Sequence, residues 1–141
     1  MNNSVESAFE LALKAHKGQV DKAGKAYIMH PVRVASNFKE DNLIIVSLLH
    51  DVVEDTDIQL VQIESLFGKE IALAVDGLTR RENESYDDFI SRCSGNELSR
   101  RVKIEDLKDN MDLTRLKTVG EKDLARVEKY KKALNDLLRH K

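Results

Sequence analysis

The feature that most constrains this chain is the apolar segment Leu43 to Asp55 (LIIVSLLHDVVED), which a few polar residues interrupt. A helix that is apolar on nearly every side is normally buried. Burying unpaired polar groups would cost about 2–7 kcal/mol for each neutral group and more for each charge, so these residues need partners. The segment therefore predicts one wall of an active site. Its polar residues recur at the spacing i, i+3, i+4 and i+7, along one helix face: Ser47, His50, Asp51 and Glu54.

A metal ion is the cheapest partner for a cluster of histidine and aspartate. His30, just before Pro31 at the entrance to the next helix, and Asp106, in a later polar segment, are ligand types on separate elements. Adjacent residues on a helix point about 100° apart, so His50 and Asp51 converge only on an ion above the groove between them. We hypothesise that His30, His50, Asp51 and Asp106 form a site suited to Mn²⁺, Fe²⁺ or Zn²⁺. A His-Asp pair is common, so the pattern alone leaves a purely structural role open.

Helical periodicity dominates the rest of the sequence, and no segment alternates convincingly as a strand does. Pro31 is expected to open a helix at its first turn, Gly68 to stop one, and Ser85 to cap another. The chain is therefore predicted to be all-α, with residues 1–141 in one domain. The expected helices cover residues 5–16, 32–38, 41–54, 57–67, 70–78, 88–93 and 96–111, with a last amphipathic helix after Gly120.

Composition argues against several classes of partner. The net charge is −2, tryptophan is absent and aromatic residues make up 5%, which disfavours nucleic-acid binding. The apolar runs are shorter than the ~18–20 residues that span a bilayer, so no membrane association is expected. With no signal-peptide pattern and a single cysteine, Cys93, we expect a cytoplasmic protein.

Four segments of the sequence resemble the hydrolase half of the bifunctional (p)ppGpp synthetase/hydrolases and the small alarmone hydrolases of the HD superfamily. They run in the order found in that family, over roughly residues 8–116, and the block around His50 is the most specific. The resemblance implies an HD-domain helical bundle that hydrolyses the stringent-response nucleotide. The segments are residues 15–19 with 24–31, 48–56, 67–68 with 75–79, and 102–106 with 110–111.

The resemblance assigns roles to individual residues. It implies that His30, His50, Asp51 and Asp106 are the metal ligands, with Mn²⁺ as the usual ion. A bound metal lowers the pKa of water toward ~7, and a nearby carboxylate then completes the deprotonation. The acidic pair Glu54 and Asp55 matches the residues that activate or orient this water. Glu54 is the first choice as base, because it lies one turn from His50.

Substrate contacts are expected from four further residues. Asn110 lies one turn beyond Asp106, and the family's residue at this position contacts the nucleotide. Lys103 shares that face and is a candidate for phosphate binding, although a solvated lysine is an equally good interpretation. Tyr27 and Arg115 are expected to line the same pocket.

The sequence departs from the family pattern where relatives carry cations. Asp21 replaces an arginine that helps to hold guanine, and Asp109 and Asp112 replace a histidine and an arginine. Each lost charge-assisted hydrogen bond removes about 1.5–3 kcal/mol of binding. Lys17, Lys22 and Lys25 are available to compensate.

The leading hypothesis is a metal-dependent phosphohydrolase that converts (p)ppGpp to GDP or GTP by removing the 3′-pyrophosphate. One alternative keeps the mechanism but changes the substrate to another phosphorylated nucleotide, which the acidic departures favour. A second alternative is a nucleotide-binding module without turnover. The presence of Glu54 beside the ligand set argues against that module, because binding alone needs no water-activating carboxylate.

Overall fold

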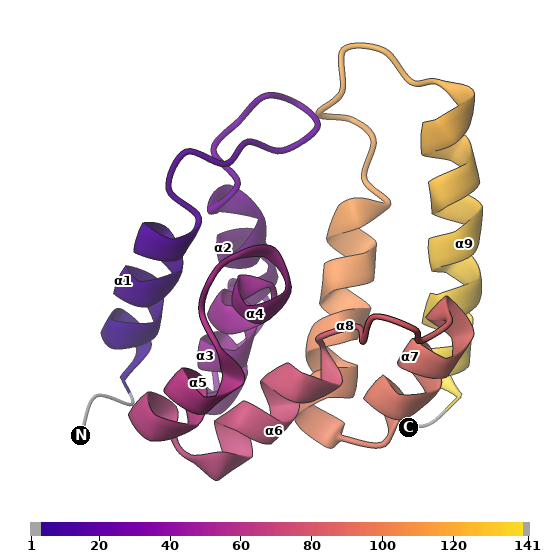
Figure 1. Cartoon of the computed structure of the whole chain (residues 1–141). Coiled ribbons are helices and arrows are strands. Elements are labelled where there is room, and N and C mark those ends of the chain that lie inside the picture. The colour runs from indigo at the N-terminus through magenta and orange to yellow at the C-terminus, as the bar shows by residue number, and fades with distance from the viewer. Residues whose placement is uncertain (1–3, 140–141) are drawn as a thin grey trace.

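In the computed structural model, residues 4–139 are described, and they form nine helices (Figure 1). The only extended pairing in this part of the chain is an isolated antiparallel bridge between Val20 and Ala26. The predicted all-α class is therefore confirmed. The helices are α1 (Val5–Ala15), α2 (Met29–Ala35), α3 (Asp41–Leu49), α4 (Val52–Asp55), α5 (Leu60–Phe67), α6 (Lys69–Gly77), α7 (Tyr86–Ser94), α8 (Glu97–Asn110) and α9 (Glu121–Leu138).

Local signals set most helix ends. The Ser85 hydroxyl accepts the backbone N–H of Asp88 at 3.1 Å, and the Asn96 side chain accepts that of Ser99 at 3.0 Å. These bonds satisfy N–H groups that have no partner within the helix. Gly68 separates α5 from α6 with a φ of 93°, a conformation that favours glycine.

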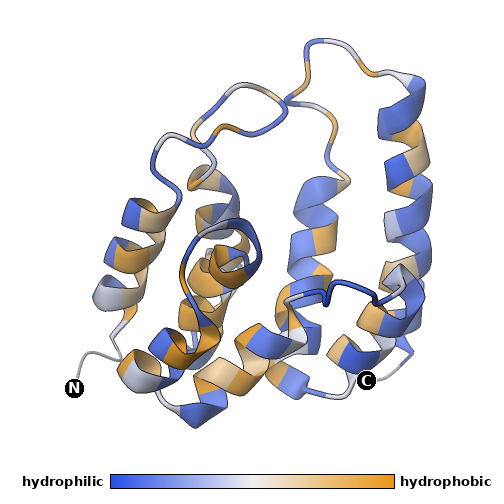
Figure 2. Cartoon of the chain, viewed as in Figure 1, coloured by the Kyte–Doolittle hydropathy of each residue, from blue (hydrophilic) through white to orange (hydrophobic). Residues whose placement is uncertain are grey.

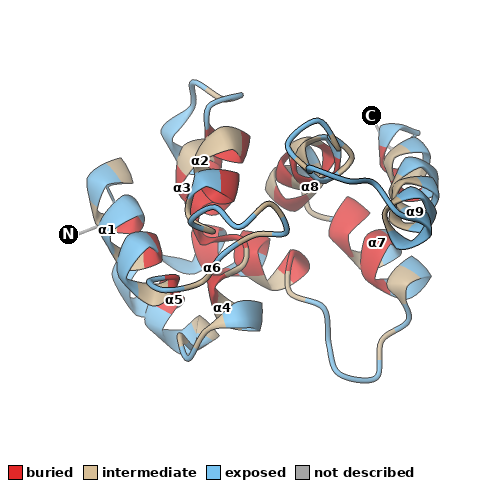
Figure 3. Cartoon of the chain, turned by 90° about the horizontal axis from the view of Figure 1, so that it is seen from above, coloured by how far each residue is buried: buried red, intermediate tan, exposed pale blue. Residues whose placement is uncertain are grey.

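The apolar residues gather into two clusters (Figure 2). The larger cluster joins α1 to α6 and includes Cys93 of α7, and the smaller joins α7, α8 and α9. Helix α8 belongs to both, because Val102 packs in the first cluster and Leu107 in the second. Seen from above, buried residues line the inward faces of the helices (Figure 3). Helix α8 packs against α2 and α3, and its polar face, which carries Asp106, lies toward these two helices. None of the described helices is long and apolar enough to cross a membrane.

Several helix boundaries differ from the sequence prediction; α5, for example, begins at Leu60 and not at residue 57, and two of the differences affect the site. Helix α2 begins at Met29, so His30 lies inside its first turn and not before it. The helix predicted over 41–54 is broken: α3 ends at Leu49 and α4 starts at Val52. The Ser47 carbonyl, which would accept the Asp51 N–H in a continuous helix, accepts the backbone N–H of His50 at 3.5 Å and its Nδ1–H at 2.6 Å.

Helices α6 and α8 pack tightly at Gly77. A Cβ atom at this position would lie 2.4 Å from the Ser99 hydroxyl, which donates to the carbonyl of Ala74 at 2.6 Å. We expect Gly77→Ala to destabilise the fold by about 1–3 kcal/mol, because the hydroxyl must give up its bond or the helices must separate. Chemical denaturation would measure this. Gly95→Ala is the control, since the nearest atom to its added Cβ is at 3.4 Å; equal losses would contradict the prediction.

Candidate active site

His30 is held on both sides by carboxylates from α8. Its Nδ1 lies 2.7 Å from Asp109 Oδ2, and its Nε2 lies 2.8 Å from Asp106 Oδ1. Burial lowers the pKa of His30, but the hydrogen bonds to these two carboxylates outweigh it and raise the pKa above its ordinary value. The ring is therefore fixed with Nε2 directed at the centre of the site.

The orientation of the His50 ring is likewise fixed, in this case by a hydrogen bond to a backbone carbonyl. Its Nδ1–H donates to the Ser47 carbonyl, which leaves Nε2 to face Asp51 Oδ2 at 3.0 Å and Asp106 Oδ1 at 3.3 Å. The break between α3 and α4 permits this convergence, so the expectation of an uninterrupted helix through His50 and Asp51 was wrong. Ser47 was also expected on the site wall. Its hydroxyl instead donates to the Leu43 carbonyl within the core.

Asp106 is the centre of the cluster. Besides the two histidines, its carboxylate accepts from Lys103 Nζ at 2.8 Å and Asn110 Nδ2 at 3.1 Å. Burial raises the pKa of Asp106, but Lys103 and His50 outweigh it and hold the pKa well below the usual range. Asp106 is therefore an anion inside the protein.

Asp51 completes the set predicted from sequence. Its Oδ2 lies 3.8 Å from His30 Nε2 and accepts the hydroxyl of Tyr27. Burial raises the pKa of Asp51, but the adjacent His50 outweighs it and lowers the pKa to about 2.

These donors suit a divalent metal. One ligand atom from each of His30, His50 and Asp106 lies within 4.8 Å of the others, and all three residues are buried. The Nδ1–H of each histidine has an acceptor outside the cluster, so the Nε2 atoms, which face Asp106, are the atoms that would bind a metal, as in metal-ligating histidines. Two imidazoles and carboxylate oxygens match the preferences of first-row divalent ions.

The acidic pair occupies the exposed end of α4. Glu54 Oε1 accepts the backbone N–H of Arg80 at 2.8 Å, which ties this carboxylate to the segment after α6. Partial burial of its carboxyl group, followed by the negative charges of Asp51 and Glu54, raises the pKa of Asp55 to about 6. A carboxylate with such a pKa can both accept and hold a proton near neutral pH.

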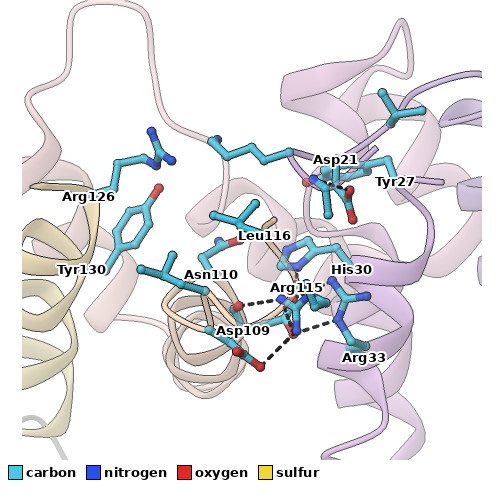
Figure 4. Close-up of a pocket in the computed structure, with 15 residues that line it drawn as sticks. Asp21, Tyr27, His30, Arg33, Asp109, Asn110, Arg115, Leu116, Arg126 and Tyr130 are labelled. Carbon is cyan, nitrogen blue, oxygen red and sulfur yellow. Dashed lines mark hydrogen bonds and ion pairs between the residues drawn. The ribbon is translucent and has the colours of Figure 1, made fainter. Parts of the chain in front are cut away.

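A pocket of about 210 Å³ opens beside His30, between the loop before α2, the end of α8 and the start of α9 (Figure 4). Of the expected substrate contacts, Tyr27, Asn110 and Arg115 line it. Lys103 does not; it pairs with Asp106 and lies over the Phe89 ring, 5.2 Å from its centre. Its charge therefore has a partner within the protein.

The acidic residues that replace cations of the family pattern bond to other groups of the protein. Asp21 Oδ1 accepts the backbone N–H groups of Ala23 and Lys25, both at 2.9 Å, and so closes the loop. Asp112 pairs with Arg115 at 3.1 Å. Most of the positively charged side chains that line the pocket are thus paired with carboxylates.

Sequence reasoning missed Arg33, and it named Asp109 only as a departure from the family pattern, without its contact with His30. Arg33 follows His30 by three residues, and Asp109 follows Asp106 by three, so each lies on the same helix face as a candidate ligand. That spacing was the sequence signal that could have identified these two residues as part of the site. Arg126 and Tyr130 of α9 also line the pocket, and only the tertiary fold brings them there.

Comparisons with known proteins show which family the chain matches. The HD domain family profile matches residues 8–134. A probable guanosine-3′,5′-bis(diphosphate) 3′-pyrophosphohydrolase of Synechocystis sp. is 47% identical over 77 residues, covering 52% of this chain and 10% of that protein. The corresponding Aquifex aeolicus pyrophosphohydrolase is 32% identical over 119 residues, covering 76% and 17%. The chain therefore spans less than a fifth of the length of these relatives.

A solved structure has the same fold. It is described as a metazoan ortholog of SpoT that hydrolyzes ppGpp and plays a role in starvation responses. The TM-score is 0.77 at 22% sequence identity, and the alignment covers 96% of this chain and 85% of the other.

Proposed function

This chain belongs to the HD domain family, and from that premise we propose that it is a metal-dependent phosphohydrolase that removes the 3′-pyrophosphate of (p)ppGpp. The observation that carries the proposal is the convergence of His30, His50, Asp51 and Asp106 beside a pocket large enough to admit part of a nucleotide. The relatives named as (p)ppGpp pyrophosphohydrolases support the choice of substrate.

These four residues would hold the metal, and Mn²⁺ is the ion we propose. A divalent ion at this position supplies charge for the phosphoryl oxygens and lowers the pKa of a coordinated water toward ~7. Asp106 and Asp51 supply the negative charge that attracts the ion, and the hydrogen bonds on both Nδ1 atoms keep the imidazoles in the binding orientation.

The acidic pair, Glu54 and Asp55, would orient the attacking water and accept its proton. We assign proton acceptance to Asp55, whose pKa of about 6 suits a base at neutral pH. Glu54, fixed by the Arg80 N–H, orients the water. This reverses the order expected from sequence, in which Glu54 was the first choice as base.

The pocket would position the nucleotide. Asn110 reaches it from the end of α8, while Tyr27 provides an aromatic wall and Arg115 a cation. Of the four proposed ligands, His30 lines this pocket, so a nucleoside bound there would lie on the His30 side of the metal. Lys103 would act indirectly, by holding Asp106.

One observation favours a second candidate substrate. Arg33 and Arg115 are paired with Asp109 and Asp112, so less positive charge is available than a multiply phosphorylated ligand would use. A phosphorylated nucleotide of lower charge would fit this balance.

A turnover experiment tests both candidates. The protein with Mn²⁺ is incubated with ppGpp, pppGpp and a panel of nucleoside mono-, di- and triphosphates, and the products are separated by anion-exchange chromatography. We expect GDP and pyrophosphate from ppGpp, and no turnover with EDTA. Release of phosphate only from other nucleotides would overturn the (p)ppGpp assignment but keep the phosphohydrolase; no turnover of any nucleotide would overturn both.

A further inference from the structure

We propose that Asp109 is a positioning residue that fixes the His30 imidazole for metal binding and so sets the metal affinity of the site. The inference rests on the proposed function, because it takes His30 as a metal ligand. Its basis is the contact of Asp109 Oδ2 with His30 Nδ1 at 2.7 Å, on the far side of the ring from the site centre.

The contact lies in a protected environment. The His30 side chain is 5% exposed and that of Asp109 12%, so water has little access to replace the carboxylate as the acceptor. An acceptor on Nδ1 keeps a proton on that nitrogen, which leaves Nε2, on the side of Asp106 and Asp51, as the atom that would bind the metal. The carboxylate also increases the basicity of the imidazole.

Asp109 is itself held by arginines. Arg33 donates through Nε to Oδ1 at 2.9 Å and through a terminal nitrogen to Oδ2 at 3.1 Å, a two-point contact that fixes the plane of the carboxylate. Arg115 donates to the Asp109 backbone carbonyl at 3.0 Å, and Figure 4 shows both arginines beside Asp109. The carboxylate is therefore fixed before any metal binds.

Helix geometry places the two contacts together. Asp106 and Asp109 are three residues apart on α8, and His30 and Arg33 are three residues apart on α2. One carboxylate of α8 thus contacts the Nε2 side of His30, and the other contacts the Nδ1 side. Asp109 also lines the pocket, so contact with substrate is the competing role.

Metal binding in the absence of substrate separates these roles. The dissociation constant for Mn²⁺ is measured on the EDTA-treated, dialysed protein from the electron paramagnetic resonance signal of free Mn²⁺. Losing a partner of this kind typically weakens metal binding by about 10–100-fold, and we expect that for Asp109→Leu. Asp109→Asn should lose less, since its amide oxygen can still accept from Nδ1–H.

Two controls test the explanation. Asp112→Asn removes the same charge from the same pocket without touching a histidine and should keep the wild-type affinity for Mn²⁺. Arg33→Met removes the two-point contact with Asp109 but leaves the carboxylate beside His30, so it should weaken Mn²⁺ binding less than Asp109→Leu. Thermal unfolding of each variant reports whether it is folded.

The outcomes are distinguishable. Wild-type affinity in folded Asp109→Leu would overturn the inference while the metal site of the proposed function stands. An equal loss in Arg33→Met would also overturn it, because Asp109 would then act by pairing α2 with α8. Failure of the wild-type protein to bind Mn²⁺ would overturn the ligand assignment and this inference with it.

Discussion

Asp55→Asn is expected to lower kcat by about 10²–10⁴-fold, the usual cost of removing a general base, with little change in Mn²⁺ affinity. The same substitution should raise the unfolding temperature of the metal-free protein above about pH 6. Burial and the charges of Asp51 and Glu54 raise the pKa of Asp55 to about 6, above the ~3.9 of an unfolded chain. The ionised form therefore costs folding free energy.

The sign of the pH dependence follows from these two pKa values. Above about pH 6, Asp55 is ionised in both states, and its ionisation destabilises the folded one; asparagine removes that cost. Below about pH 4, Asp55 is protonated in both states, and the variant should gain nothing. Differential scanning calorimetry between pH 4 and pH 8 measures the difference.

Two further variants control this prediction. Asp57→Asn, on the exposed segment after α4, should change neither the unfolding temperature nor its pH dependence. Glu54→Gln should lose less activity than Asp55→Asn, because the amide oxygen can still accept the Arg80 N–H. A larger loss in Glu54→Gln would make Glu54 the base, as the sequence suggested.

Asp106→Asn is expected to abolish both Mn²⁺ binding and turnover. Asp106 contacts both histidines, and a neutral amide is a poorer ligand for a hard divalent ion. The substitution also leaves the largely buried Lys103 ammonium without its partner, and breaking a buried ion pair costs about 3–5 kcal/mol. Elemental analysis of the purified variant and a (p)ppGpp assay measure the two losses.

A second substitution keeps this result interpretable if Asp106→Asn unfolds. The double variant Asp106→Asn with Lys103→Met removes both charges and should regain stability, because neither ion is then left unpaired. It should still bind no Mn²⁺. A folded double variant that retains stoichiometric metal would show that Asp106 is not a ligand.

The sequence by itself determined the helical class, most helix ends and the types of residue in the site. These features are local. A cap such as Ser85 or Asn96 bonds to a backbone group three residues away, and the apolar segment around His50 has to be buried wherever it packs. The residue spacing therefore carries this information without knowledge of the fold.

The tertiary structure alone decided how the site is assembled. The break at His50 and Asp51 was not predictable, because a continuous helix satisfies the same apolar pattern. In the structure, the His50 ring bonds to the Ser47 carbonyl that the Asp51 N–H would use in such a helix. The pairing of Asp109 with His30 joins residues 79 positions apart, and packing of α8 against α2 is what brings them together. Sequence spacing shows which residues share a face of one helix. The orientation of a metal-binding side chain depends on which other helix supplies its hydrogen-bond partner.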